Sequence, residues 1–414
     1  MGDRIQVPLE LEHFDVVETE LADGQLEVSV ASTFPRACFH CGSTDVIGHG
    51  RNRRRIRDRS HGYPTVLVWD QRRYRCRDCG RTSRERHPET LGSKRVTARF
   101  RSSLADAACS QPWSDVASRE RVSWWRVADA FEARASAFDP FTGSAPRVVS
   151  LDEASFRSRF VFHTVLSAPE QHRILELVEG RSRQSARQAL LGMPARWRGS
   201  IETAVIDMCW PYRKAVEDVL PHARIVADKF HVMRTVDTAA QKVRIRHGRR
   251  IRVVGSDGGL ARQNNPRFNP KMWRSRWLFM RRVNGLTPSE RAGLDQLFEL
   301  HPEVGLAYWL KEAFAHIYQA TSREEGETRL DLWVHHVHQA GIPELISTWI
   351  NMQWWREPIL NYFDDPQTNA YAEGITNKIK VLKRRGYGHR DPHRYRAKVL
   401  AITPNQPTDP PPTA

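Results

Sequence analysis

Three acidic residues stand where they could hold metal ions for phosphodiester chemistry. Asp152 ends the run VVSLD, Asp207 ends the run ETAVID, and Glu373 lies in NAYAEGITNKIKVLKRRGYG, which has helical periodicity. The two runs are short and rich in β-branched residues, so they predict strands. Carboxylates that two strands and a helix bring together can hold two divalent ions about 3.5–4 Å apart, one beside the attacking oxygen and one beside the leaving oxygen. The pattern predicts a Mg²⁺ or Mn²⁺ site made by Asp152, Asp207 and Glu373.

Other side chains nearby compete for these roles. Glu153 follows Asp152 directly, but neighbouring residues of a strand point to opposite faces, so only one of the two can reach the site. Asp228 ends the run ARIVAD and remains open as a direct ligand or as a group behind the ligands. His231 and the histidines of residues 335–338 are expected to be structural.

The segment that holds Glu373 predicts an amphipathic helix. It follows Asp365-Pro366, and Thr368 or Asn369 would cap its first turn. One face is apolar and would lie on a sheet, while the other would turn Glu373 toward the metal ions and basic donors toward DNA phosphates. The basic candidates are Lys380, Lys383, Arg384 and Arg385. A solvated helix without a ligand is the alternative.

Four of the six cysteines form two matched pairs. The pairs are Cys38-Phe-His-Cys41-Gly and Cys76-Arg-Asp-Cys79-Gly, separated by 34 residues. In a cytosolic chain such knuckles fit a structural Zn²⁺ better than disulfides. A redox dithiol and a metal-free module are the alternatives, and His40 and His49 are minor candidate ligands. Cys109 and Cys209 are expected to be buried thiols.

Positive charge gathers around the cysteine pairs. The net charge is +16, and residues 51–101 hold sixteen arginines against five acidic residues. No amphipathic apolar stripe accompanies these arginines, so the density favours a polyanion such as double-stranded DNA over a membrane surface or a merely solvated face. The candidates for contact with phosphates are Arg53, Arg54, Arg55, Arg57, Arg72, Arg73 and Arg75.

The first third of the chain predicts two DNA-binding modules. Residues 13–33 alternate around an Ala-Asp-Gly turn and predict a hairpin, and Tyr63–Tyr74 predicts a further strand, so residues 1–88 form a β-rich zinc ribbon. Residues 95–140 predict a helix-turn-helix, with a helical linker as the alternative. At most one of Trp124 and Trp125 can face the core. Trp124 and Arg126 are candidates for DNA contact.

The remainder predicts a mixed α/β core with an insertion. Strands are expected at 147–153, 160–167, 173–178, 201–207 and 224–228, with helices at 183–191 and 211–220. This is the order of a ribonuclease-H-like fold, in which the first and fourth strands end side by side. Residues 146–240 and 363–400 would form the core, and 241–362 an all-helical insertion that contains a basic loop at 248–272. The proline-rich tail, 401–414, is expected to be disordered.

These segments carry a family resemblance. CFHCG, RNRRRIRDRS, YRCRDCG, LDEASF, VIDMCWPYRKAV, ARIVADKFHV and AEGITNKIKVLKRRGYGHR resemble bacterial insertion-sequence transposases of the ISL-three group, in order over residues 13–392. The resemblance implies a DDE transposase whose acidic triad falls on Asp152, Asp207 and Glu373. It also implies a zinc ribbon and a helix-turn-helix that bind the terminal inverted repeats of a mobile element, with target DNA as second substrate.

Bulk properties limit the remaining possibilities. A chain of 414 residues needs more than one domain. No apolar run is long enough to span a membrane, and the start of the chain lacks an apolar signal region, so we expect a cytoplasmic protein. We expect a homodimer or higher oligomer when two DNA ends are held together. A transposase-derived regulator without catalysis and a ribonuclease-H-like nuclease or resolvase remain alternatives.

Overall fold

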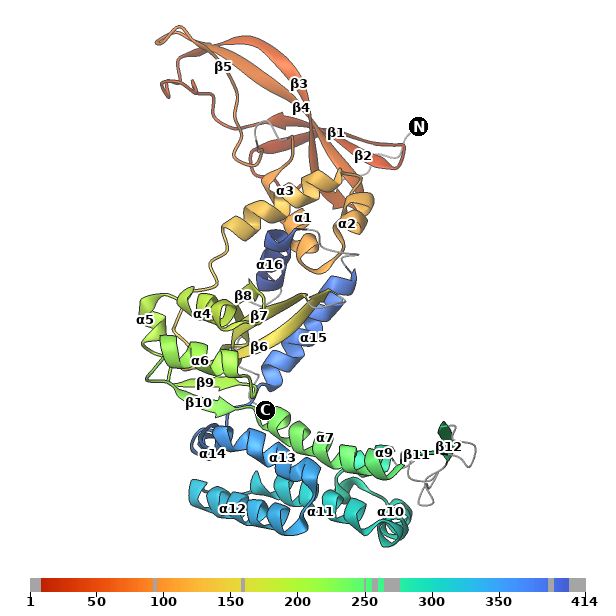
Figure 1. Cartoon of the computed structure of the whole chain (residues 1–414). Coiled ribbons are helices and arrows are strands. Elements are labelled where there is room, and N and C mark those ends of the chain that lie inside the picture. The colour runs from red at the N-terminus through yellow and green to blue at the C-terminus, as the bar shows by residue number, and fades with distance from the viewer. Residues whose placement is uncertain are drawn as a thin grey trace, which may run out of the picture. The chain divides into compact units, whose positions relative to one another are not determined.

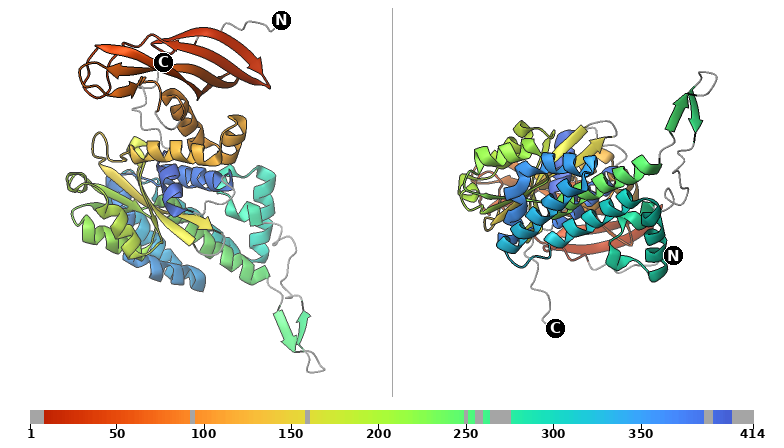
Figure 2. Two further views of the ribbon diagram at one scale, coloured as in Figure 1. Left: turned by 90° about the horizontal axis from the view of Figure 1, so that it is seen from above. Right: turned by 60° about the horizontal axis from the view of Figure 1, so that its bottom comes forward.

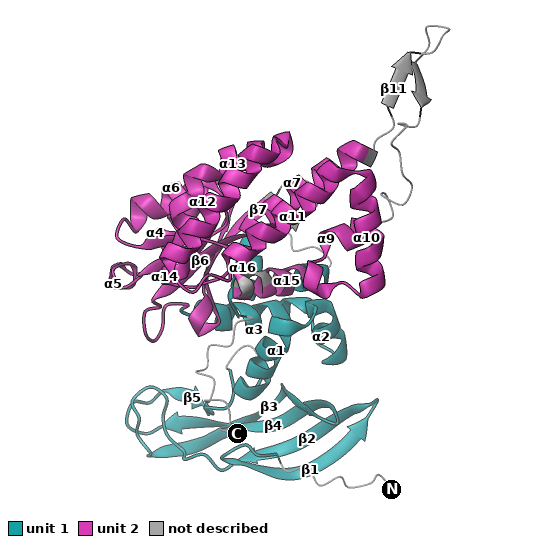
Figure 3. Ribbon diagram, turned by 90° about the horizontal axis from the view of Figure 1, so that it is seen from below, with its two compact units in different colours: residues 1–139, 381–402 teal, residues 140–380, 403–414 magenta. Residues whose placement is uncertain are grey.

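The computed structural model describes residues 9–91, 95–157, 161–248, 251–254, 260–263, 276–385 and 391–401. The chain divides into two compact units, Met1–Asp139 with Val381–Ile402 and Pro140–Lys380 with Thr403–Ala414 (Figures 1 and 3). The predicted tail lies, except for Ala401, outside the described residues. None of the helices in the described ranges is long and apolar enough to cross a membrane.

A twisted five-stranded sheet forms the N-terminal part of the first unit. Its strands are β1 (Phe14–Ala22), β2 (Gln25–Ser32), β3 (Val46–His61), β4 (Tyr63–Cys76) and β5 (Thr82–Arg84), in the order β1-β2-β4-β3 with β5 beside β4. Asp23 and Gly24 connect β1 to β2 with φ of 52° and 66°, the left-handed pair that a tight hairpin turn requires. The predicted hairpin and the predicted strand from Tyr63 are confirmed.

Three helices follow the sheet, and a fourth joins them from the end of the chain. They are α1 (Ala98–Ser110), α2 (Trp113–Arg119), α3 (Trp124–Ser136) and α16 (Pro392–Ala401). Lys398 of α16 donates to the carbonyl of Gln111 at 2.9 Å, and Arg394 pairs with Glu132 of α3 at 2.6 Å. Residues 391–401 therefore belong to the first unit, whereas the sequence had assigned them to the catalytic core.

Packing explains why α1 adjoins the sheet. Thr97 caps the first turn of α1 and also donates to Asp58 of β3 at 2.6 Å. Arg99, in the same first turn of α1, also donates to this fully buried carboxylate. A buried carboxylate is tolerated only when charged or polar donors satisfy it, so this contact ties helix to strand.

A mixed sheet forms the centre of the second unit. Its strands are β6 (Val148–Arg157), β7 (Val161–Ala168), β8 (Arg173–Glu179), β9 (Thr203–Ile206) and β10 (Arg224–Ala227), in the order β10-β9-β6-β7-β8. The first three are antiparallel, and β9 runs parallel to both β6 and β10. Every predicted strand is present. Two of them differ in extent, because β6 continues past the predicted end at residue 153 to Arg157, paired with β7, and β9 spans only Thr203–Ile206.

Helices α4 (Arg183–Leu191), α5 (Ala195–Arg198) and α6 (Trp210–Val219) accompany this sheet. The predicted helices at 183–191 and 211–220 are confirmed. Tyr212 of α6 lies 3.1 Å from the hydroxyl of Thr164 on β7, which fixes α6 to the buried surface of the sheet. The short 3₁₀ helix Pro169–Gln171 lies between β7 and β8.

The insertion is built mainly from helices but is not all-helical. Its helices are α7 (Lys229–Gly248), α9 (Arg276–Met280), α10 (Pro288–Leu300), α11 (Pro302–Ile317), α12 (Arg323–Ala340), α13 (Pro343–Met352) and α14 (Arg356–Asp364), with 3₁₀ turns at Val283–Gly285 and Gln353–Trp355. Two strands, β11 (Ile251–Val254) and β12 (Leu260–Gln263), pair antiparallel where a basic loop was expected (Figure 2). Much of that loop lies outside the described residues.

The last residues of the insertion contact the mixed sheet. Asn361 of α14 donates to the carbonyl of Ile225 on β10 at 2.8 Å. Asp365, just beyond α14, accepts from Thr203 of β9 at 2.7 Å and pairs with Arg147 at 2.9 Å. These contacts fix where α15 (Ala370–Arg385) begins.

Candidate metal centres

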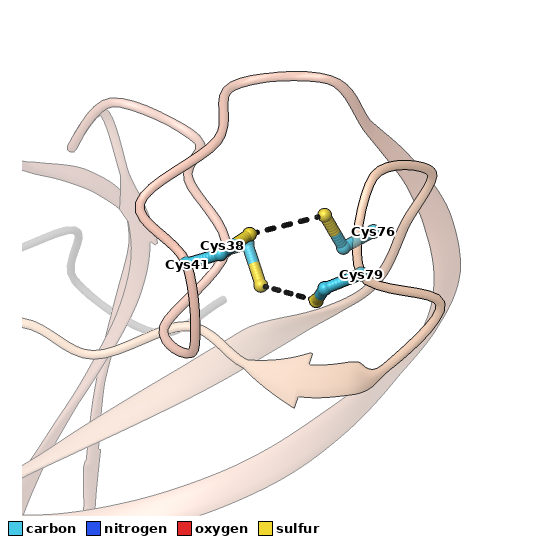
Figure 4. Close-up of side chains that lie close together, drawn as sticks. All are labelled: Cys38, Cys41, Cys76 and Cys79. Carbon is cyan, nitrogen blue, oxygen red and sulfur yellow. Dashed lines mark hydrogen bonds between the residues drawn. The ribbon is translucent and has the colours of Figure 1, made fainter.

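The four predicted cysteines converge at one point in the first unit (Figure 4). Their sulfur atoms all lie within 4.8 Å of one another, with Cys38 to Cys79 and Cys41 to Cys76 each at 3.6 Å. A tetrahedral zinc site with Zn–S bonds of about 2.3 Å has sulfur–sulfur edges of about 3.8 Å. The cluster therefore fits Zn²⁺, and in the described residues neither His40 nor His49 belongs to it.

The two knuckles have matching backbones. Each glycine after the second cysteine has positive φ, 75° at Gly42 and 67° at Gly80. This lets the chain turn back so that amides reach the sulfurs. The backbone N–H groups of Cys41 and His40 donate to Cys38 and lower its thiol pKa to about 6. A thiolate is the form that binds zinc, so these N–H groups favour the zinc-binding form of Cys38.

A second cluster lies where the parallel pairing of β6 with β9 ends. Leu151 of β6 pairs with Ile206 of β9, so Asp152 and Asp207 are the next residues on adjacent parallel strands. Asp152 is 9% exposed, whereas Glu153 is turned outward and lies 3.6 Å from Arg181. Burial and the neighbouring Asp207 charge raise the pKa of Asp152 to about 6. Two carboxylates that follow paired residues of adjacent strands favour a cation between or beside them.

Asp228 joins the cluster through His231. The imidazole Nδ1 lies 2.9 Å from both Asp207 and Asp228, and the backbone N–H of His231 also donates to Asp228 at 3.1 Å. The bonds to Asp207 and then Asp228 raise the pKa of His231 to about 10, so it is a cation at neutral pH. Burial would raise the pKa of Asp228, but His231 and the backbone N–H of Asn369 outweigh it and lower it.

Helix α15 reaches the same carboxylates. Thr376 donates to Asp152 at 2.9 Å, and Asn369 donates from its side chain to Asp207 at 3.3 Å. Glu373 lies on α15, three residues before Thr376, but its side chain lies outside what the structure describes. The backbone of α15 thus brings position 373 to the sheet edge that holds Asp152 and Asp207.

Three of these contributors were underestimated or missed from the sequence. His231 was expected to be structural, Asn369 was considered only as a cap, and Thr376 was not singled out. The segment ADKFH did contain a signal, because an aspartate three residues before a histidine at a helix start can bond both its backbone and its side chain.

The basic candidates of the first unit fall into two groups. Arg72 is mostly buried and bonds Glu85 and the carbonyl of Phe34, while Arg57 bonds Gln25 and the carbonyl of Glu120. These contacts hold the unit together and occupy both guanidinium groups. Arg55 is exposed but paired with Glu27.

The remaining candidates differ in exposure. Exposed side chains are Arg53, Arg75, Lys380, Arg384 and Arg385, and partly buried ones are Arg54, Arg73, Arg126 and Lys383. Trp124 is 38% and Trp125 69% exposed, so neither is a core residue. The guanidinium of Arg394 lies 5.6 Å and 5.8 Å from the two rings.

Taken with the sheet order, the two clusters define a class of protein. A four-cysteine cluster at a basic sheet, and a mixed sheet with carboxylates directly after the last paired residues of two parallel strands, are typical of enzymes that process nucleic acids. A family model described as transposase matches residues 149–399, and one for the zinc finger of transposases IS204, IS1001, IS1096 and IS1165 matches residues 35–79. The chain belongs to this family of insertion-sequence transposases, the ISL-three group.

Individual relatives agree with this assignment. The transposase for insertion sequence element IS1001 of Bordetella parapertussis is 27% identical over 372 residues, which cover 89% of this chain and 88% of the relative. The transposase for insertion sequence element IS1557 of Mycobacterium tuberculosis is 24% identical over 319 residues, covering 73% and 70%. The two family models together span both candidate metal centres.

Proposed function

We propose that this transposase cuts and joins DNA at a divalent-metal site made by Asp152, Asp207 and Glu373. The observation that carries the proposal is the register of β6 and β9, which sets Asp152 and Asp207 side by side, with α15 bonded to Asp152 through Thr376. The order β10-β9-β6-β7-β8 supports a ribonuclease-H-like core. Position 373 on α15 would complete the triad.

The residues around the triad prepare it for cations. His231 and Asn369 both contact Oδ1 of Asp207, so neither of them occupies the other carboxylate oxygen, Oδ2. Asp152 is held by Thr376 and by the backbone N–H of Glu153 at 2.7 Å. Fixed carboxylate oxygens are what Mg²⁺ and Mn²⁺ prefer. Bound there, such ions would activate the attacking oxygen and stabilise the leaving oxygen.

DNA would be held by the first unit and by the end of α15. We retain Arg53, Arg75, Lys380, Arg384 and Arg385 as phosphate contacts, because their side chains are exposed. We no longer propose Arg57 and Arg72 as phosphate contacts, because their guanidinium groups bond to partners within the first unit. After the leading helix α1, helices α2 and α3 would act as the helix-turn-helix, with Trp124 and Arg126 in the first turn of α3. The partners would be terminal inverted repeats and target DNA, with two or more copies holding two ends.

The test is cleavage of a labelled element end in Mg²⁺ by Asp152→Asn, Asp207→Asn and Glu373→Gln, with end binding measured in parallel. Each variant should bind the end and fail to cut. Glu153→Gln is the matched control, because it removes a neighbouring acid whose side chain points to the other face. Cleavage at the wild-type rate by Glu373→Gln would show that Glu373 is not a metal ligand.

The two alternative functions make different predictions in the same assay. A regulator without catalysis would bind ends and cut none, and a nuclease or resolvase would cut without joining the freed 3′ end to target DNA. Both triad aspartates are buried or partly buried at one sheet edge, which does not favour the regulator. Strand-transfer products on a target plasmid would exclude the nuclease.

A further inference from the structure

The side chain of Asn369 has a buried oxygen without a hydrogen-bond partner in the part of the chain that the structure describes. The residue is 3% exposed and directly precedes α15. Its backbone N–H donates to Asp228 at 2.9 Å and its side-chain N–H donates to Asp207 at 3.3 Å. Its carboxamide oxygen, Oδ1, has no hydrogen-bond partner among the described residues. Buried polar atoms in folded proteins are nearly always partnered, so this oxygen points to a ligand.

The surroundings indicate which chemistry that ligand has. An amide oxygen can only accept, so its partner must be a cation or a donor. Asp207 lies beside it, and Oδ1 of Asp207 already meets His231 and Asn369. No hydrogen bond involves the other carboxylate oxygen of Asp207 within the described ranges. One carboxylate oxygen and one carboxamide oxygen remain, and this pair suits a hard divalent cation.

We propose that Asn369 is a direct ligand, through its carboxamide oxygen, of the divalent ion that Asp207 binds. This inference rests on the proposed function and adds a neutral fourth residue to the acidic triad. A neutral ligand would complete the coordination without further negative charge at a site that already holds Asp152, Asp207 and Asp228. The same residue also links the ends of β9 and β10 to the start of α15, four residues before Glu373.

The experiment measures Mn²⁺ binding to the full-length, zinc-loaded protein by calorimetry in the absence of DNA. Asn369→Ala should weaken binding at least about 10-fold, the low end of what losing a supporting or ligating group costs a metal site. Asn369→Asp should restore it, because it keeps an oxygen at that position. Asn351→Ala removes an exposed amide from α13 and should bind as the wild type does.

The aspartate variant separates a ligand from a positioning group. If Asn369 acted only by donating its side-chain N–H to Asp207, Asn369→Asp would lose that donor and set two carboxylates together, so its affinity would fall as far as in Asn369→Ala. That result would overturn the proposal, as would wild-type affinity in Asn369→Ala. A circular-dichroism melt in Mn²⁺-free buffer checks that each variant is folded.

Asp207→Asn distinguishes failure of the inference from failure of the proposed function. Loss of Mn²⁺ binding in Asp207→Asn, with none in Asn369→Ala, would overturn the role of Asn369 alone. Unchanged binding in Asp207→Asn would overturn the carboxylate site itself. As a second readout, half-maximal cleavage by Asn369→Ala should require about 10-fold more Mn²⁺ at an unchanged maximal rate.

Discussion

The two candidate metal centres are assembled in opposite ways. The cysteine cluster takes all its ligands from two short knuckles, residues 38–41 and 76–79, and backbone N–H groups within the first knuckle donate to the sulfur of Cys38. The carboxylate centre draws on three strands, α7 and α15, and the hydrogen bond from Thr376 to Asp152 joins residues 224 apart in the sequence. The first centre depends on local geometry, while the second depends on the whole sheet being in register.

The largest expected effect is on catalysis at the carboxylate centre. Asp207→Asn should lower cleavage of an element end by at least about two orders of magnitude, because the metal ions would have one fixed charge fewer. The unit should stay folded, since asparagine has nearly the same shape and can still accept from Asn369. Urea unfolding followed by circular dichroism provides the check. Cleavage within a few-fold of wild type would show that the register argument chose the wrong ligand.

Loss of a ligand at the cysteine centre should impair folding of the first unit and not only catalysis. Cys76→Ser removes one of four thiolates, and structural zinc sites supply folding energy directly. We expect about one zinc per chain in the wild type and none in the variant, with loss of protection from hydrogen exchange at the ends of β3 and β4. Cys109→Ser, outside the cluster, is the matched control. Retained zinc in Cys76→Ser would mean that the cluster is not its site.

His231 provides a test of how far the carboxylate centre depends on internal charge. His231→Gln leaves the buried Asp228 without its cation, which should destabilise the metal-free second unit by about 2–3 kcal/mol, below the ~3–5 kcal/mol of a fully buried pair because the imidazole is partly exposed. Because the folded pKa of about 10 lies above the ordinary 6.5, this stabilisation is complete below pH 6.5 and is lost as pH rises through 10. Urea titrations at pH 6 and pH 10 measure it, and an equal loss at both would contradict the charge explanation.

Replacing Asp152 should change the stability of the metal-free second unit in the opposite direction from replacing His231. Its folded pKa of about 6 lies above the ordinary 3.8, so its ionised form costs stability above pH 6 and the cost disappears below pH 3.8. Asp152→Asn should therefore stabilise the metal-free second unit by about 2–3 kcal/mol at pH 7. Unfolding in Mg²⁺-free buffer with zinc bound measures it, and the gain should shrink by pH 5. A destabilised variant at pH 7 would mean that Thr376 and the backbone already compensate the charge.

The difference between the two centres also explains what could be predicted from the sequence. The cysteine pairs could be predicted because their spacing is short and the thiol chemistry is specific. Asp152 and Asp207 could be predicted because β-branched runs lead into them, and parallel pairing of the two strands then sets them side by side. His231 and Asn369 could not be assigned in this way, since their roles arise only when α7 and α15 meet the ends of β9 and β10.

Three further features could not be predicted from the sequence, because each depends on contacts between segments. Strand periodicity cannot tell an exposed arginine from one whose head group turns back to a partner, so Arg57 and Arg72 looked like Arg53. The basic segment after α7 lacks a strong alternation, and the pairing of β11 with β12 was missed. Helix α16 was assigned to the catalytic core because sequence order suggested it. Its buried Lys398 and its pair between Arg394 and Glu132 instead fix it to α1 and α3.

The smallest expected effect concerns those arginines and tests the division between exposed and internally bonded side chains. Arg53→Ala should make the log–log dependence of end binding on salt less steep by about 0.9, because one DNA phosphate would no longer be neutralised, with stability unchanged. Arg72→Ala should leave that slope unchanged but destabilise the sheet, because Glu85 is left buried without its partner. Filter binding at four salt concentrations and a thermal melt measure both quantities. If Arg72→Ala altered the slope as Arg53→Ala does, the internal hydrogen bonds of Arg72 would have to give way to DNA, and exposure would be a poor guide to the DNA-binding face.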